Sequence, residues 1–304
     1  MDTLSAIAAN QRRSTLLITV LLVLLGALGG AIGYAVMGTQ TGLLIGVGGG
    51  AVVFAIMMFI NMRSGESALL KSANARQVGK ADAPELYGIV ESLAQRAALP
   101  VTPKVYIIDT DVPNAFAVGL KPERACVAVT TALASRLDRE ELRGVLAHEM
   151  GHIANRDTVF MTMAGVTMGG IVLMANYASH AMTYNAGVRR GRGRSSGGAG
   201  ALFILIGLAV SILAPICARL LYFACSRERE YLADATAAEF TSNPAALASA
   251  LQKISSRQNP KTIPHNGAVN PLYIINPLAA SGSSNIFGTH PPTEERIRRL
   301  LAMR

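Results

Sequence analysis

The 304-residue sequence contains no tryptophan, only three cysteines and few charged side chains. Cys126, Cys217 and Cys225 are odd in number and far apart, which excludes a disulfide framework, and the lack of a CxxC pair argues against a thiolate zinc site. Charged residues make up 15% of the chain, whereas soluble domains average about 25%. Because 51% of the residues are hydrophobic, we expect part of the chain to lie in lipid.

The net charge of +9 does not indicate a protein that binds nucleic acid. Lysines and arginines are scattered, and no basic run alternates with aromatic residues as such surfaces require. An excess of basic residues beside apolar segments is instead typical of proteins oriented in an anionic membrane. The expected partners therefore include the lipid bilayer and no nucleic acid.

No charged side chain occurs between Ser14 and Met62. A polar break at Gly38–Gly42 divides this run into two segments, 14–37 and 42–62, each close to the ~20 residues that cross a hydrocarbon core. A cleaved signal peptide does not fit, because the first run is too long and a second follows without a small-residue cleavage site. Buried helices of a soluble protein are the alternative to an N-terminal transmembrane hairpin.

Basic residues lie on one side of this predicted hairpin. Arg12 and Arg13 precede the first span, the connecting break has no basic residue, and four follow the second span, namely Arg63, Lys71, Arg76 and Lys80. Lysine and arginine near the ends of spans stay on the cytoplasmic side. Both flanks, and the domain that begins at residue 63, are therefore expected to be cytoplasmic.

Two later charge-free runs, at about 158–179 and 199–218, predict a second apolar helical hairpin. The segment between them is rich in arginine, with Arg189, Arg190, Arg192 and Arg194. An even number of crossings would place these arginines outside, against the usual rule, so either they are tolerated there or the hairpin is shallow. The predicted organisation is a transmembrane hairpin over 1–62 and a domain over 63–304 that this second hairpin interrupts.

The remaining sequence predicts a mainly helical domain with a small β-sheet. Residues 63–100 have a helical pattern, and Pro84 begins a helix with four apolar positions at helical spacing, Leu86, Ile89, Val90 and Leu93. Short strands are expected at 105–108 and 125–129, with Asn114–Gly119 between them. Asp138 and Glu141 then form a capping box that predicts a helix from residue 139 to about residue 155.

His148, Glu149 and His152 form an HExxH motif within that last helix. Two imidazoles four residues apart lie on one face, a turn apart, and can reach the same ion. Glu149 is offset by one position, so its carboxylate can take a proton from a zinc-bound water, whose pKa the metal lowers to about 7. A structural or regulatory zinc is the alternative to a catalytic one.

A catalytic zinc needs a third protein ligand, and the sequence leaves several candidates. His180, His265 and His290 are available, but Glu230 is better placed, because Glu230 and Asp234 lie four residues apart just after the last apolar run. Asp234 can then hydrogen-bond to an imidazole N–H and fix its tautomer. The alternative is a solvated charged face. If the two later runs form a hairpin, this segment and the HExxH helix meet at one membrane face.

Four segments together carry a family resemblance: HEMGHIANRD at 148–157, SREREYLAD at 226–234, NAFA at 114–117 and THPPTEERIRRL at 289–300. At these positions the sequence resembles the HtpX-type membrane metalloproteases, which are relatives of the CAAX prenyl endoproteases. The resemblance extends over nearly the whole chain, including the N-terminal apolar hairpin.

This resemblance implies an integral membrane protein with a gluzincin-type zinc peptidase domain. It implies one Zn²⁺ per chain held by His148, His152 and Glu230. It also implies Glu149 as catalytic base and Asp234 as a residue that contacts a ligand and not the metal. It also implies an edge strand that pairs with the main chain of the substrate, formed by Asn114, Ala115, Phe116 and Ala117.

The implied activity is that of a zinc-dependent endopeptidase at the cytoplasmic face of the bacterial inner membrane, in a multi-pass protein. Its substrates are expected to be polypeptides, above all misfolded or damaged membrane proteins, in membrane-protein quality control and stress response, with interplay with other quality-control proteases. Glu149 would assist the attack of zinc-bound water, and His290 and Arg296 are candidates for a second oxyanion donor.

Two other functions compete with this interpretation. A membrane scaffold or transporter with a structural zinc would have no need of Glu149 beside its ligands. A prenyl-protein endoprotease would need more spans, because four apolar runs fall short of the seven in that family.

Overall fold

The computed structural model describes residues 3–159, 161–163, 227–255, 274 and 291–303. The chain forms two compact units, one made of residues 1–14, 64–165 and 221–304 and the other of residues 15–63 and 166–220. The predicted second hairpin and the arginine-rich segment within it lie outside the described residues, apart from 158–159 and 161–163.

The described part of the apolar unit consists of residues 15–37 of helix α1 (Thr3–Met37) and residues 40–63 of helix α2 (Gln40–Ser72), with the two residues between them. Within the described residues, α2 is the helix whose length and composition suffice to cross a membrane. This agrees with the second predicted span, whereas the first span, on α1, stays a prediction. The polar break is shorter than expected: Gly38, at φ +63°, and one further residue join the helices.

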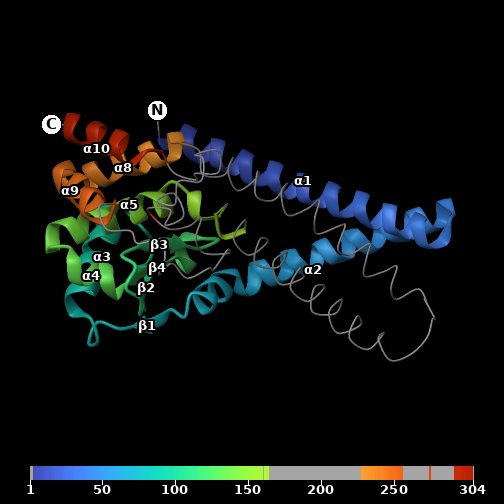
Figure 1. Cartoon of the computed structure of the whole chain (residues 1–304), viewed down its shortest axis with the longest axis horizontal. Helices are drawn as coiled ribbons and strands as arrows, with labels where there is room; N and C mark the ends of the chain where they lie inside the picture. The colour runs from blue at the N-terminus through green and yellow to red at the C-terminus, as the bar shows by residue number, and fades with distance from the viewer. Residues whose placement is uncertain (1–2, 160, 164–226, 256–273, 275–290, 304) are drawn as a thin grey trace, which may run out of the picture. The chain divides into compact units, whose positions relative to one another are not determined.

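Glycines allow α1 and α2 to run side by side in this unit (Figure 1). A Cβ atom added to Gly29 would collide with the carbonyl oxygen of Gly46, and one added to Gly46 would collide with that of Gly29. Gly33 and Gly42 are related in the same way one turn further along. Close helix pairs in lipid use small residues for this reason, since no hydrophobic effect drives apolar helices together there.

The other unit contains a four-stranded sheet in the order β1-β2-β4-β3 (Figure 1). Its strands are β1 (Arg76–Val78), β2 (Lys104–Ile108), β3 (Ala115–Val118) and β4 (Cys126–Thr130). β2 and β4 are parallel, and β1 and β3 are antiparallel to their neighbours. The strands expected at 105–108 and 125–129 are confirmed to within one residue, and β3 lies within the segment 114–119, at an edge of this sheet.

The helical prediction for residues 63–100 is only partly right. The helix that begins at Pro84 is confirmed as α3 (Pro84–Arg96), with all four predicted apolar positions buried. However, residues 76–78 form β1, which pairs with β2. Three residues with one buried side chain are too few for a periodic signal, so the pairing with β2 decides their conformation.

Helices surround the HExxH helix α5 (Arg139–Ala154), which packs against β3, α3, α8 (Arg227–Thr241) and α9 (Pro244–Ser255). The short segments η1 (Pro122–Arg124) and α4 (Thr131–Arg136) flank β4, and α10 (Thr293–Ala302) packs on α8 and α9. Val145, Leu146 and Met150 of α5 are fully buried and belong to one core with the sheet. The helix that carries the motif is therefore fixed on several sides.

The end of β3 is held by a buried carboxylate. Glu66, in the last turns of α2 and 5% exposed, accepts hydrogen bonds from the Leu120 backbone N–H (3.1 Å) and from Arg124 (2.7 Å). Gly119 begins this turn, and its N–H donates to Thr162 Oγ1 at 2.9 Å. These bonds fix the loop between β3 and β4, and with it the position of the edge strand.

Candidate metal centre

The helix that carries the motif begins at the predicted capping box. Asp138 accepts from the Glu141 N–H at 2.9 Å, and Glu141 accepts from the Asp138 N–H at 3.0 Å, so the box is confirmed. Glu141 also accepts from Ser249 and Lys253 of α9, each at 2.6 Å. The beginning of α5 is thus tied both to its own first turn and to α9.

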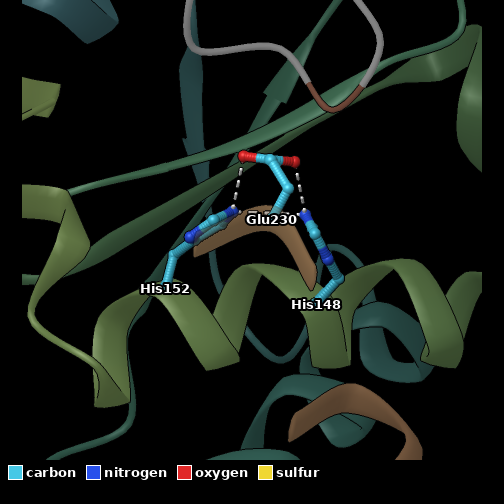
Figure 2. A group of neighbouring side chains, drawn as sticks. All are labelled: His148, His152 and Glu230. Atoms are coloured by element: carbon cyan, nitrogen blue, oxygen red, sulfur yellow. Dashed lines mark hydrogen bonds and ion pairs between the residues drawn. The ribbon is translucent and has the colours of Figure 1, made fainter. Parts of the chain in front are cut away.

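His148 and His152 point the same way from α5 and meet Glu230 from α8 (Figure 2). The two Nε2 atoms are 3.2 Å apart, and each lies 3.6 Å from a carboxylate oxygen of Glu230. Two ligand atoms at tetrahedral positions, each 2.0–2.1 Å from a zinc ion, are about 3.4 Å apart. The three side chains therefore fit the edges of a zinc tetrahedron, and all three are buried.

Gly151 is one reason why α8 can bring Glu230 so close to α5. A Cβ atom at this position would lie 3.2 Å from the carbonyl oxygen of Ala233 and 3.3 Å from the Cβ of Thr236, both on α8. These distances are at the lower limit of real contacts, so the glycine inside the HExxH motif lets the two helices approach each other.

The Nδ1 atom of each histidine contacts a separate carboxylate. His148 Nδ1 lies 2.9 Å from Asp234 Oδ1, and His152 Nδ1 lies 3.0 Å from Asp157 Oδ2. A carboxylate on Nδ1 holds the ring orientation and leaves Nε2 as the ligand atom. Both Asp157 and Asp234 are buried.

Asp157 is a site residue to which sequence reasoning gave no role. It lies within the HEMGHIANRD stretch but beyond the end of α5, where Asn155 is the C-cap and Arg156 has a φ of 60°. This turn brings Asp157 back toward His152. The only sequence signal is a carboxylate five residues after His152, which spacing alone does not distinguish from a surface aspartate.

Arg296 lies against the same group, although it comes from α10. Its Nε and Nη2 atoms donate to the two oxygens of Asp234 at 2.9 and 2.7 Å, and Nη1 is 3.6 Å from Glu230 Oε2. Burial would raise the pKa of Asp234, but the Arg296 charge and the hydrogen bonds from His148 and Arg296 outweigh burial and hold that pKa well below its usual range. Asp234 is therefore an ionised acceptor.

The other predicted site residues are placed as follows. Glu149 is buried, 2% exposed, between the two histidines in sequence. Asn114 is fully buried just before β3, and its side-chain oxygen accepts from the Ala115 N–H at 3.1 Å. Phe116 and Ala117 are buried within β3. His290, His180 and His265 lie outside the described residues.

Comparison with known proteins identifies the family. A family model for peptidase family M48 matches residues 80–304. Two proteins named "Protease HtpX homolog" are similar over most of their length: one from Ligilactobacillus salivarius is 41% identical over 97% of each chain, and one from Pyrococcus furiosus is 44% identical over 87% of this chain and 92% of its own. A crystal structure of S. mikatae Ste24p aligns with a TM-score of 0.49 and 18% identity, over 98% of this chain and 67% of that one.

The family indicated by the four sequence motifs is thereby confirmed. M48 enzymes are zinc metalloproteases, and His148, His152 and Glu230 lie close enough together to bind one metal ion. The chain is therefore a metalloprotease of the HtpX type and belongs to peptidase family M48.

Proposed function

We propose that this protein is a zinc-dependent endopeptidase that cuts misfolded or damaged membrane proteins at the cytoplasmic face of the bacterial inner membrane. The observation that carries the proposal is the buried triangle of His148, His152 and Glu230, whose spacing fits one zinc ion. Its setting in an M48 chain with an apolar helix long enough to span a membrane supports the membrane location.

The proposed ligands are those three side chains, with one zinc ion per chain. Two imidazoles and a carboxylate are a common donor set of catalytic zinc peptidases and leave one position open. When bound, the metal would act as a Lewis acid toward the scissile carbonyl and lower the pKa of a water molecule. Asp234 and Asp157 keep the two imidazoles oriented for binding.

Glu149 is the proposed general base. Its position next to His148 on α5 puts its carboxylate beside the ligand set, and its burial removes competing water. In this proposal Glu149 takes a proton from the attacking water and delivers it to the leaving amine. One residue then serves as base in the first half of the reaction and as acid in the second.

The edge strand β3 is the proposed docking site for the substrate main chain. In the sheet of the described residues β3 is the last strand and pairs with β4, and it packs against α5, which carries the motif. Main-chain pairing at a sheet edge reads few side chains, which suits an enzyme that must accept many unfolded sequences.

Substituting Glu149→Gln tests the chemistry. We expect cleavage of casein, or of an unfolded membrane protein, to fall by at least about 100-fold, while zinc remains near one equivalent. Full activity in the purified variant would refute the assignment of the base. Loss of zinc together with activity would show that Glu149 acts in binding the metal.

The membrane orientation rests on Arg12 and Arg13 before the first span and the basic residues after the second. Single cysteines placed at Asn10 and at Thr39, in a chain without its three native cysteines, test it with a membrane-impermeant thiol reagent on intact cells. We expect labelling at residue 39 and none at residue 10. The reverse pattern would refute the orientation.

A further inference from the structure

Arg296, on the C-terminal helix α10, is a fully buried arginine. Its side chain is 1% exposed, whereas Arg298 and Arg299 on the same helix are exposed and pair with Glu295. Burying a guanidinium group is costly unless its donors are used in good geometry. The contacts of Arg296 should therefore account for its burial.

The first set of contacts leads to the metal ligands. Nε and Nη2 bind both oxygens of Asp234, in the bidentate geometry that only arginine provides. The same oxygen that accepts from Nη2, Asp234 Oδ1, is 2.9 Å from Nδ1 of His148. The guanidinium group thus fixes the carboxylate, and the carboxylate fixes the imidazole, against which Nη2 also lies directly, 3.3 Å from Nδ1.

The second contact leads to the edge strand. Nη1 of Arg296 donates to the carbonyl oxygen of Ile274 at 3.1 Å, and the N–H of Ile274 donates to the carbonyl oxygen of Ala115 at 3.1 Å. Ile274 is itself 1% exposed and belongs to the hydrophobic core. A single residue therefore connects the guanidinium group to the first residue of β3.

We propose that Arg296 is a positioning residue, which holds the metal ligand His148 and the edge strand β3 in a fixed relation through Asp234 on one side and Ile274 on the other. The half that concerns His148 rests on geometry alone. The half that concerns β3 rests on the proposed function, in which this edge binds the substrate main chain. Lysine cannot replace Arg296, because one ammonium group cannot span the carboxylate and also reach Ile274.

The test of the metal half is the zinc dissociation constant of the full-length Arg296→Lys variant, measured by competition with a fluorescent chelator. We expect it to rise ten- to 100-fold, which is the usual effect of losing a partner of a ligand. Arg298→Lys, on the exposed side of α10, is the matched control and should leave the constant unchanged. A change below twofold in folded Arg296→Lys overturns this half.

A double-mutant comparison tests whether Arg296 acts through Asp234. If it does, Asp234→Asn and the double variant Asp234→Asn/Arg296→Lys should have the same zinc dissociation constant within about twofold. If the double variant instead raises the zinc dissociation constant by the product of the two single effects, Arg296 does not act through Asp234, and this part of the proposal is overturned. A purely structural role would lower the melting temperature of the zinc-free protein and leave these constants alone.

The substrate half is tested by kinetics at saturating zinc. With the metal restored, Arg296→Lys should still raise KM for an unfolded substrate about tenfold, because Ile274 no longer holds the first residue of β3 in place. A KM equal to that of wild type overturns this half. If Glu149→Gln proves active, the proposed reaction fails, but the zinc measurements still decide the metal half.

Discussion

Asp157, whose carboxylate contacts Nδ1 of His152, gives the sharpest test of how the two histidines are oriented. Asp157→Asn keeps the size and shape of the side chain and removes its charge. The amide can still accept from His152 Nδ1, which now lies 3.0 Å from a carboxylate oxygen. The substitution therefore isolates the contribution of the negative charge to metal binding.

The expected magnitude follows from the kind of bond that is lost. A hydrogen bond to a charged group contributes about 1.5–3 kcal/mol and a neutral one about 0.5–1.5 kcal/mol. Asp157 is fully buried, so solvent screens this difference little. A loss of about 1.4 kcal/mol raises the zinc dissociation constant about tenfold.

The assay must separate metal affinity from folding, because Asp157 Oδ1 is also 3.9 Å from Arg229 Nη1. Zinc-free protein in detergent is titrated against a fluorescent zinc chelator at pH 7, and its melting temperature is measured in parallel. Asp111→Asn, which changes an exposed aspartate, is the matched control. A folded Asp157→Asn variant whose zinc constant stays within twofold of wild type would refute the role of Asp157 in orienting His152.

Three further predictions concern the proposed third ligand, the helix pair and the capping box. Glu230→Ala should reduce bound zinc after dialysis from about one equivalent to near zero, whereas Glu239→Ala, on the exposed face of α8, should not; metal analysis decides. Gly46→Ile should lower the free energy of unfolding by about 1–3 kcal/mol, because the new side chain would collide with α1. Gly48→Ile, whose side chain meets open space, is the control, and thermal unfolding followed with a thiol-reactive dye compares the two variants. Burial alone would raise the pKa of Glu141, but the hydrogen bonds from Lys253 and Ser249 of α9 outweigh burial and lower that pKa. Glu141→Gln should therefore lower the free energy of unfolding by about 1 kcal/mol at pH 7.

The sign of the pH effect at Glu141 follows from that lowered pKa. The stabilisation is present above the ordinary glutamate pKa of about 4.3 and is lost as the pH falls through the lower value of the folded state. The difference in melting temperature between wild type and Glu141→Gln should therefore be constant near neutral pH and disappear in acid. A difference that grows below pH 4 would contradict this reasoning.

Local patterns in the sequence sufficed for the helix that carries the chemistry. The capping bonds of Asp138 and Glu141 join each side chain to a backbone N–H three residues away, so the start of α5 can be predicted without tertiary structure. The HExxH spacing likewise needs only helical geometry to put His148 and His152 on one face. The same holds for α3, whose apolar positions recur at helical spacing.

Strand β1 was missed because its cause is not local. Residues 76–78 contain one buried side chain, Val78, and their conformation is stabilised by pairing with β2, some 30 residues later in the chain. A pattern of three residues has too little information to distinguish a strand from the end of a helix. The first predicted span, by contrast, remains a prediction, since charge-free composition is its main support.

The sequence by itself determined the family, the motif and the fact that Glu230 and Asp234 share a helical face. Tertiary structure decided which atoms meet: it brings α8 against α5 at Gly151, turns Asp157 back to His152 and buries Arg296 behind Asp234. The physical reason is the distance along the sequence between the residues that interact. Capping and helical spacing act within a few residues and leave a readable pattern. Contacts between α5, α8 and α10 join residues up to 148 positions apart, and no local pattern encodes such a separation.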